Sequence, residues 1–562
     1  MKADLTRDTF HPFKHFDRVL MQQGRVQLDA DWNEQAAILL HYMRTLAANL
    51  IGPAGGPEAN FGFGVTPFAP MSTTDFQIGF GDYYVDGLLC QADFMPTAIS
   101  STSSTGVFQV MNWRSDFELT PIPYFEVFDD TPGTANITAV AVTISNPVKS
   151  SSQVTITPNV AGPGFSNFVN PKLRRCITYL HQPDYIYSTV TGAISPPPLP
   201  SGECQIYLDV WERVITYAED DSIREVALGG PDTAARTKLV WQVKWIQTPP
   251  DANTAGECAT FLSLYEQLQP ANRGWLQAMA KQGSPSTDPC IINPNARYTG
   301  PENQLYRVEI NRAGGPWNGV DPTDITSATF KWSRENGSVV YPIASGGGTS
   351  SVVVESLGRD DRFGLTPGEF VEVQDDRSVL MNLPGNLLAV QGIDSSTLTV
   401  SLGGTPDTVL GSDESLHPLL RRWDQTEGDP AEGGLTLAND NAAFVQEGKW
   451  LMLEDGVQVF FQPGAGAPTP TQPNVNQYRT GDFWLIPART ATGDVEWPKV
   501  TDVHGNLETD TNGNPIPIAL PPHGITHHYA PLAVVSVSPN GVTPQPDCRS
   551  SFEPLAVSVE GK

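Results

Sequence analysis

A helical stripe of apolar residues stands out near the start of the chain. Between residues 31 and 51 the spacing of these positions is 4, 3, 4, 3, 4, which places them on one face of an α-helix. Asp31 followed by Glu34 has the pattern of a capping box, and Gly52-Pro53 provides a stop signal. We therefore predict an N-terminal amphipathic helix with this stripe: Trp32, Ala36, Leu39, Met43, Leu46 and Leu50.

The pattern leaves two ways to cover this stripe. The helix can pack on the chain's own sheets, or copies of it can associate around a symmetry axis. The stripe is shorter than the three or four heptads that would indicate a coiled coil alone. We treat its six residues as the candidate assembly interface.

After the helix, apolar and polar residues alternate with the period of β-strands. Segments 206–214, 305–310 and 370–373 read as half-buried antiparallel strands. Two hairpins are predicted, one over 328–341 around Asn336-Gly337 and one over 450–461 around Asp455-Gly456, because both dipeptides suit a type I′ turn. The fold class is therefore mainly β, with several antiparallel β-sandwich or barrel-like domains and one N-terminal amphipathic helix.

The length of 562 residues suggests three or four domains at roughly 150 residues each. Segment 97–174 is poor in charge and rich in Ser and Thr, and the flanking segments 83–90 and 176–180 look like neighbouring strands, so we interpret it as an inserted domain. The predicted organisation is an N-terminal anchor and helix (1–60), a central β domain (61–96 plus 175–345), a small inserted β domain (97–174), a further β domain (346–425) and a C-terminal β domain (426–562).

The charge narrows the class of partner. The chain has 34 basic and 62 acidic residues, a net charge of −28, which repels phosphate backbones and anionic membranes. The N-terminus lacks an apolar stretch, and no window approaches the roughly 18 apolar residues of a membrane span, so we expect synthesis in the cytoplasm without a signal peptide. The six cysteines form no C-x-x-C pair, and we expect free, mostly buried thiols.

The segment from Met21 to Gln35, MQQGRVQLDADWNEQ, resembles the opening of an uncharacterised bacterial family associated with phage-tail-like and extracellular contractile injection systems. Segments 208–213, 225–233, 302–310, 330–337 and 524–529 extend the resemblance. Within the opening, the signature residues are Gln23, Gly24, Arg25, Asp31, Asn33 and Glu34.

The resemblance implies a non-enzymatic structural subunit, associated with the baseplate as a shell, a cage or a decoration. Its partners would be other subunits of the baseplate or spike region and further copies of itself, in a trimer- or hexamer-related homo-oligomer. It implies neither nucleic-acid binding nor direct membrane insertion. On the assembled particle the subunit would be extracellular after release.

Two clusters have residue types that bind metals. His523, His527 and His528 include an i, i+4 pair, but Pro521, Pro522 and Gly524 break the helix that this spacing needs. Glu508, Asp510 and Asn512 resemble the first half of a calcium loop, yet Ala519 occupies the position of its closing carboxylate. They remain weak candidates, and we expect no metal and no cofactor.

The motifs of common catalytic sites are missing from the sequence. It has no G-x-S-x-G elbow and no phosphate-binding G-x-x-x-x-G-K-[ST] loop. We therefore expect no enzymatic activity and no catalytic residues. The alternatives are a receptor- or glycan-binding tail fibre, and then a hydrolase of envelope polysaccharide.

Overall fold

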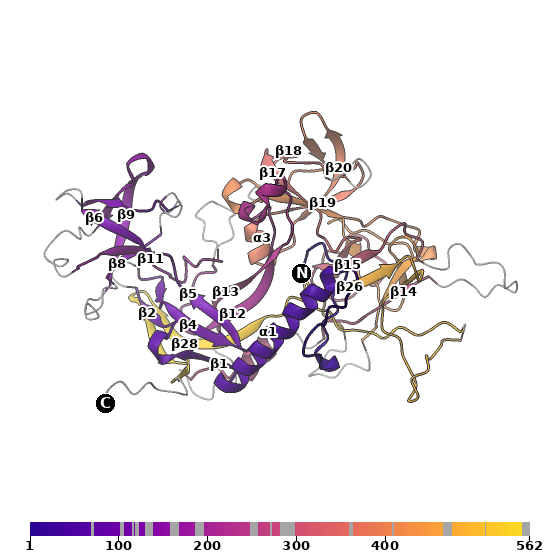
Figure 1. Ribbon diagram of the computed structural model, residues 1–562, viewed down its shortest axis with the longest axis horizontal. Coiled ribbons are helices and arrows are strands. Elements are labelled where there is room, and N and C mark those ends of the chain that lie inside the picture. The colour runs from indigo at the N-terminus through magenta and orange to yellow at the C-terminus, as the bar shows by residue number, and fades with distance from the viewer. Residues whose placement is uncertain are drawn as a thin grey trace. The chain divides into compact units, whose positions relative to one another are not determined.

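The computed structural model describes residues 1–68, 72–101, 106–114, 117, 123–129, 139–157, 168–185, 196–247, 257–269, 272–281, 298–358, 364–406, 410–464, 475–511 and 513–553. Strands make up 41% and helices 13%, so the prediction of a mainly β fold is confirmed (Figure 1). The chain divides into two compact units. Unit 1 comprises 1–41, 212–238 and 269–526, and unit 2 comprises 42–211, 239–268 and 527–562. Both units are discontinuous in sequence, and the predicted domain boundaries stay predictions about independent folding.

Unit 1 contains two antiparallel sheets that share one core. The first has the order β23 (Ala443–Phe444), β16 (Thr329–Ser333), β15 (Gln304–Arg312), β26 (Phe483–Arg489) and β27 (Asp494–Val495). The second has the order β14 (Leu276–Ala280), β25 (Val457–Phe461) and β24 (Trp450–Met452). Phe461 and Trp484 meet edge to face between the sheets, with ring centroids 6.0 Å apart.

Unit 1 also contains a closed barrel with its own apolar core. Its order is β17 (Val340–Ser345), β18 (Ser351–Val354), β21 (Thr399–Leu402), β20 (Asn386–Asp394), β19 (Phe370–Gln374) and β22 (Leu419–Trp423). Alternate residues of β19, Val371 and Val373, point into this core and are fully buried. The short helix α3 (Asp376–Leu380) follows β19 and is capped by Asp375.

One of the two predicted hairpins is wrong. Asn336 and Gly337 form the expected turn, with φ of 55° and 64°. However, β16 pairs with β15 and β23, and β17 pairs with β18 and β22. Both edges of each strand are thus occupied, and the turn carries the chain from the sheet to the barrel. The hairpin at Asp455-Gly456 is confirmed, because β24 pairs with β25.

In unit 2 the C-terminal strands complete a sheet begun much earlier in the chain. Its order is β13 (Arg236–Gln247), β12 (Gly202–Ile215), β28 (His528–Ser538) and β29 (Gly541–Asp547). A second sheet has the order β30 (Ser551–Phe552), β1 (Ala54–Pro57), β4 (Gly81–Val85) and β5 (Leu88–Ala92), and β2 (Val65–Pro67) pairs with β3 (Phe76–Ile78). The helix α2 (Phe261–Leu268) packs on β28 through Tyr265 and Tyr529, with ring centroids 5.2 Å apart.

The described strands of segment 97–174, together with Arg175, form a separate closed barrel. Its order is β10 (Gln153–Thr157), β7 (Val107–Val110), β6 (Thr97–Ser101), β11 (Lys172–Arg175), β8 (Phe125–Phe128) and β9 (Val140–Val148). The first and last strands in sequence, β6 and β11, are paired, with Ala98 opposite Lys172. The two ends of the segment therefore lie on adjacent strands; much of the segment between them lies outside the described residues.

The expectation of free thiols is wrong for one pair of cysteines. Cys258 and Cys548 form a disulfide across 290 positions of sequence, which their spacing alone could not indicate. Cys90, Cys176 and Cys204 are free and buried, as expected. Cys290 lies outside the described residues.

Candidate functional site

The six residues of the predicted stripe lie on the helix α1 (Asp29–Ile51), and all six are exposed. The exposed fraction is 76% for Trp32 and 68% for Met43. The helix contacts the protein through its opposite face, where Ala30 and Ile38 are buried. Packing on the chain's own sheets thus leaves the apolar stripe uncovered.

The inner face of α1 is close to a turn that needs a glycine. Gly87, between β4 and β5, has a φ of +78°, and a Cβ at this position would lie 2.0 Å from the carbonyl oxygen of Arg44. Ala48, one helical turn after Arg44, is half-buried and has a small side chain, which leaves room for this close approach. The apolar stripe is consequently directed away from the contact.

The predicted capping box at the start of the helix is wrong. The helix begins at Asp29, so Asp31 lies in the first turn rather than at the cap. The Asp29 carboxylate accepts the backbone N–H of Thr6 at 2.9 Å and its hydroxyl at 2.6 Å, and the Glu34 carboxylate accepts the hydroxyl of Thr9 at 2.7 Å. These acidic side chains fasten residues 1–28, the N-terminal strap, along the helix. A local pattern could not indicate contacts at this separation.

The rest of the Met21–Gln35 segment lies in and beside the strap. Gln35, its last residue, accepts the backbone N–H of Val19 at 2.8 Å. Gly24 adopts a φ of +70° in a turn, and Gln23, Arg25 and Asn33 are exposed. The strap also exposes large apolar side chains, which include Phe13, Phe16, Leu20, Met21 and Val26.

The strap starts at a cluster of buried charges in unit 1. Lys2 pairs with Glu309 at 2.8 Å, and Asn336 donates to the carbonyl oxygens of Met1 and Ala3 at 2.9 and 2.8 Å. Burial lowers the pKa of Lys2 to about 8. We call the charged residues around Lys2 the buried charge cluster: Arg307, Glu309, Lys331, Glu372 and Arg421.

The three histidines of the weak metal candidate are divided between the units. His523 belongs to unit 1, where its ring stacks on Phe483 at 5.8 Å and burial lowers its pKa. His527 and His528 belong to unit 2 and point to opposite sides because they are consecutive at the start of β28. Each of these two pairs with a different aspartate, so they do not form a ligand set.

The pair of His527 and Asp209 joins the sequence segments 208–213 and 524–529. His527 Nδ1 lies 2.6 Å from Asp209, whose other oxygen accepts from Lys244 at 2.7 Å. Burial alone would raise the pKa of Asp209, but Lys244 and His527 outweigh it and lower the pKa. The Nε2 atom of His527 is buried and has no hydrogen-bond partner among the described residues.

His528 makes the equivalent contact on the other side of the strand. Its Nδ1 lies 2.8 Å from Asp86, which also accepts the hydroxyl of Tyr265 at 3.0 Å. Burial would raise the pKa of Asp86, and these two contacts reverse the direction and lower it. Both aspartate–histidine pairs thus tie β28 to neighbouring elements of unit 2.

The candidate calcium segment is engaged in turns. Asp510 accepts the backbone N–H of Asn514 at 2.9 Å and its side-chain amide at 3.3 Å. The backbone N–H of Glu508 donates to Val500, and Asn512 lies outside the described residues. In the described part of the chain, no group of three or more His, Cys, Asp or Glu side chains could hold a metal ion.

A family model matches residues 1–157, 181–258 and 254–559, which include the strap, α1 and both segments joined by His527. The chain belongs to DUF6519, a family of unknown function. No curated protein and no solved structure matches it. The DUF6519 match therefore establishes the family but indicates no function, and any proposal about function depends on the structure and the sequence.

In the part of the chain that the structure describes, no helix is long and apolar enough to cross a membrane. The longest, α1, has 23 residues and is interrupted by charged and polar positions such as Asn33, Glu34 and Arg44. Its apolar stripe occupies only one face, which is typical of a helix that packs against protein.

Proposed function

We propose that this DUF6519 chain is a non-enzymatic structural subunit of a phage-tail-like contractile injection particle, placed in the baseplate region as a shell, a cage or a decoration. The observation that carries the proposal is the exposed apolar stripe of α1. A stripe of Trp, Leu and Met residues that the chain itself leaves uncovered is typical of a surface that another protein buries. The sequence resemblance supplies the kind of assembly.

The occupant we propose for the stripe is the same helix of a second copy of this chain. The spacing 4, 3, 4, 3, 4 is that of a seam in which side chains of one helix fit between those of another. The α1 helix of a second copy has the same spacing of apolar residues and therefore matches the stripe. An unrelated protein would match it only if its own surface had a complementary spacing. The resulting assembly is a homo-oligomer, and rings of three or six copies extend this pairing around an axis.

The charge distribution favours this pairing at α1. The whole chain has a net charge of −28, which opposes close approach of two copies. From Gln35 to Ile51, however, Arg44 is the only Lys, Arg, Asp or Glu residue. Few charges therefore oppose the approach of two copies along this part of the helix, and the exposed apolar residues of the strap add to the available contact surface.

We further propose that the subunit is made in the cytoplasm and becomes extracellular on the released particle. The disulfide between Cys258 and Cys548 supports the second part, because such bonds form and persist in oxidising surroundings. The free cysteines Cys90, Cys176 and Cys204 are buried, which protects them from oxidation after release.

The test replaces Leu39 and Met43 by Asp. Two carboxylates in the centre of an apolar seam lose their hydration on pairing, so the oligomer should dissociate into single chains. The matched control replaces Thr45 and Asn49 by Asp, which adds two charges with the same i, i+4 spacing at exposed positions outside the stripe.

Light scattering coupled to size-exclusion chromatography gives the mass of each variant, and circular dichroism verifies that the fold is retained. We expect L39D/M43D to be monomeric and T45D/N49D to keep the oligomer. When L39D/M43D replaces the wild type during particle production, the purified particles should lack this subunit. A wild-type chain that is monomeric at all concentrations, or an L39D/M43D variant that assembles normally, would contradict the proposal.

A further inference from the structure

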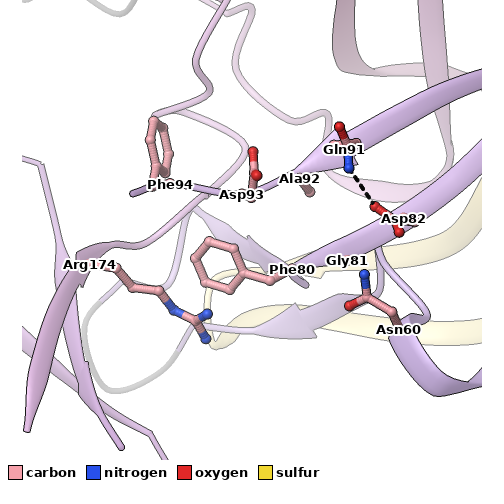
Figure 2. A pocket seen from close by; sticks show the side chains of 9 residues that line it. All are labelled: Asn60, Phe80, Gly81, Asp82, Gln91, Ala92, Asp93, Phe94 and Arg174. Atoms are coloured by element: carbon pink, nitrogen blue, oxygen red, sulfur yellow. Dashed lines mark hydrogen bonds between the residues drawn. The ribbon is translucent and has the colours of Figure 1, made fainter. Parts of the chain in front are cut away.

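A small polar pocket lies in unit 2, where the sheet with β4 and β5 meets the barrel formed by β6 to β11. Figure 2 shows the side chains that line it, and the pocket has a volume of about 210 Å³. Phe80 directly precedes β4, Asp82 is near its start, Gln91 is near the end of β5, and Arg174 belongs to β11. The lining residues are Asn60, Phe80, Gly81, Asp82, Gln91, Ala92, Asp93, Phe94 and Arg174.

Backbone geometry brings Asn60 to the pocket. The N–H of Gly62 donates to the carbonyl oxygen of Asp82 at 3.2 Å, which holds the loop after Asn60 against β4. Gly81 has a φ of +128°, and a Cβ there would lie 2.5 Å from the carbonyl oxygen of Asn60. Glycine at this position is what allows the two segments to approach so closely.

The charge of Arg174 is already balanced. Its Nε donates to Glu126 at 2.6 Å, and its guanidinium lies 3.7 Å from the ring centroid of Phe80 and 4.2 Å from that of Phe128. Stacking between two rings and pairing with a carboxylate fix this side chain as a wall of the pocket. The unbalanced charge among the lining residues is therefore that of Asp82 and Asp93.

The remaining lining groups combine polar atoms with aromatic surface. Asp82 accepts a hydrogen bond from the Gln91 amide at 3.2 Å, which leaves further acceptor positions on the carboxylate. The amides of Asn60 and Gln91 supply both donors and acceptors, and Phe80 and Phe94 supply apolar walls (Figure 2). A ligand that fits this lining has several hydroxyl groups and an apolar ring surface.

We propose that this pocket binds one neutral hexose unit of a glycan. An anionic sugar or a phosphate would be repelled by Asp82 and Asp93, and a purely apolar ligand would leave both carboxylates without hydration. The volume is below the roughly 300 Å³ at which pockets for drug-sized ligands begin, so a single sugar ring fits better than a longer chain. The proposal is independent of the assembly role of α1.

The test measures binding of single sugars to the full-length chain by saturation-transfer difference NMR. The probes are the methyl glycosides of glucose, galactose, mannose and N-acetylglucosamine, with methyl glucuronide as the anionic comparison. We expect a signal for at least one neutral glycoside and a much weaker signal for the glucuronide. A glucuronide that binds as well as the neutral sugars would overturn the proposal, as would the absence of any neutral binder.

Variants then locate the site. Asp93→Asn and Asn60→Ala change exposed lining residues, and each should weaken the best neutral binder by roughly tenfold, the effect of losing one hydrogen bond to a charged or amide group. Glu203→Gln is the matched control, because it removes an exposed carboxylate of unit 2 outside the pocket.

Binding that is unchanged in Asp93→Asn and Asn60→Ala would place the sugar elsewhere and refute the pocket. The L39D/M43D variant should bind the sugar as the wild type does. The two proposals can thus fail separately, since one readout is the mass of the oligomer and the other is sugar binding.

Discussion

Individual side chains in unit 1 show where alternation along a strand misleads. The segment 305–310 has charges at Arg307 and Glu309 between apolar residues, and this alternation predicts a half-buried strand. Both faces are buried instead: Tyr306, Val308 and Ile310 lie in the core, and Arg307 and Glu309 pair with each other at 2.6 Å. The sequence shows the charges but not their pairing: Glu309 also lies 3.7 Å from Lys331 of the neighbouring strand β16, and Lys331 in turn pairs with Glu372 of β19 at 2.7 Å.

A residue-scale prediction concerns Glu454, whose carboxylate lies 2.8 Å from Arg334 and accepts the hydroxyl of Tyr306. Burial raises its pKa to about 7, so the folded state retains a proton that the unfolded state has lost. This contribution to the free energy of unfolding is present below pH 4.5 and is lost as the pH rises to about 7. Replacing Glu454 by Gln should remove this loss.

The measurement is urea unfolding of wild type and E454Q between pH 4.5 and 7.5. We expect the free energy of unfolding of the wild type to fall by about 1–3 kcal/mol relative to that of E454Q across this range. Glu496→Gln, which removes an exposed carboxylate paired with Arg7 and Arg489, serves as the control and should run parallel to the wild type. A constant difference between wild type and E454Q would contradict the assignment.

At the scale of elements, the sequence predicted turns and helix periodicity better than it predicted neighbours. The turn at Asn336-Gly337 forms as expected, yet it joins two sheets rather than two paired strands. Turn chemistry fixes local dihedral angles, whereas pairing depends on which edges other strands have taken. The same limit applies to α1: the apolar stripe can be read from the sequence, but its exposure depends on which face of the helix contacts the rest of the chain.

The contact between α1 and the β4–β5 turn gives the element-scale prediction. Gly87→Ala should be destabilising for two reasons: a positive φ and a clash with the backbone at Arg44. Gly202 also has a positive φ, of +97°, but nothing lies within 4 Å of its would-be Cβ. Gly202→Ala therefore reports the dihedral penalty alone, about 1 kcal/mol.

Thermal or urea unfolding of the two variants separates these contributions. We expect Gly87→Ala to lower the free energy of unfolding by about 1–3 kcal/mol more than Gly202→Ala does. The reason is that the added methyl group clashes with backbone, and only a movement of the helix relieves this clash. Equal losses would mean that α1 is not held against this turn. Amide exchange in 42–51 should also become faster in Gly87→Ala if the helix is displaced.

At the scale of the whole molecule, the order of segments in the fold is not their order in the sequence. Strand β28 pairs with β12 from Val210 to Gly202, more than 300 positions earlier, and the disulfide joins Cys258 to Cys548 in the same unit. Composition and periodicity predicted a mainly β fold in several parts. They could not predict that the C-terminal strand β28 pairs with β12. Many strands share the same alternation of apolar and polar residues, so the pattern does not identify a distant pairing partner.

The barrel of segment 97–174 leads to a prediction about independent folding. Its strands close on one another around a core of their own, including Phe108, Phe125 and Val154. Thr97 lies opposite Leu173 in the β6–β11 pair, so a short linker can span the two ends. Replacing residues 97–174 by a Gly/Ser linker should leave a chain that melts cooperatively, because little of the central core is removed.

The deletion also separates folding from function. It removes Arg174 and with it one wall of the sugar pocket, so hexose binding should be lost while the homo-oligomer through α1 persists. If the barrel contacts a neighbouring subunit, incorporation into the particle should weaken even though the purified chain remains oligomeric. Light scattering, sugar binding and particle composition are the three measurements. Aggregation or loss of the cooperative transition would show that the segment belongs to the central core, and normal incorporation would exclude an assembly role for the barrel.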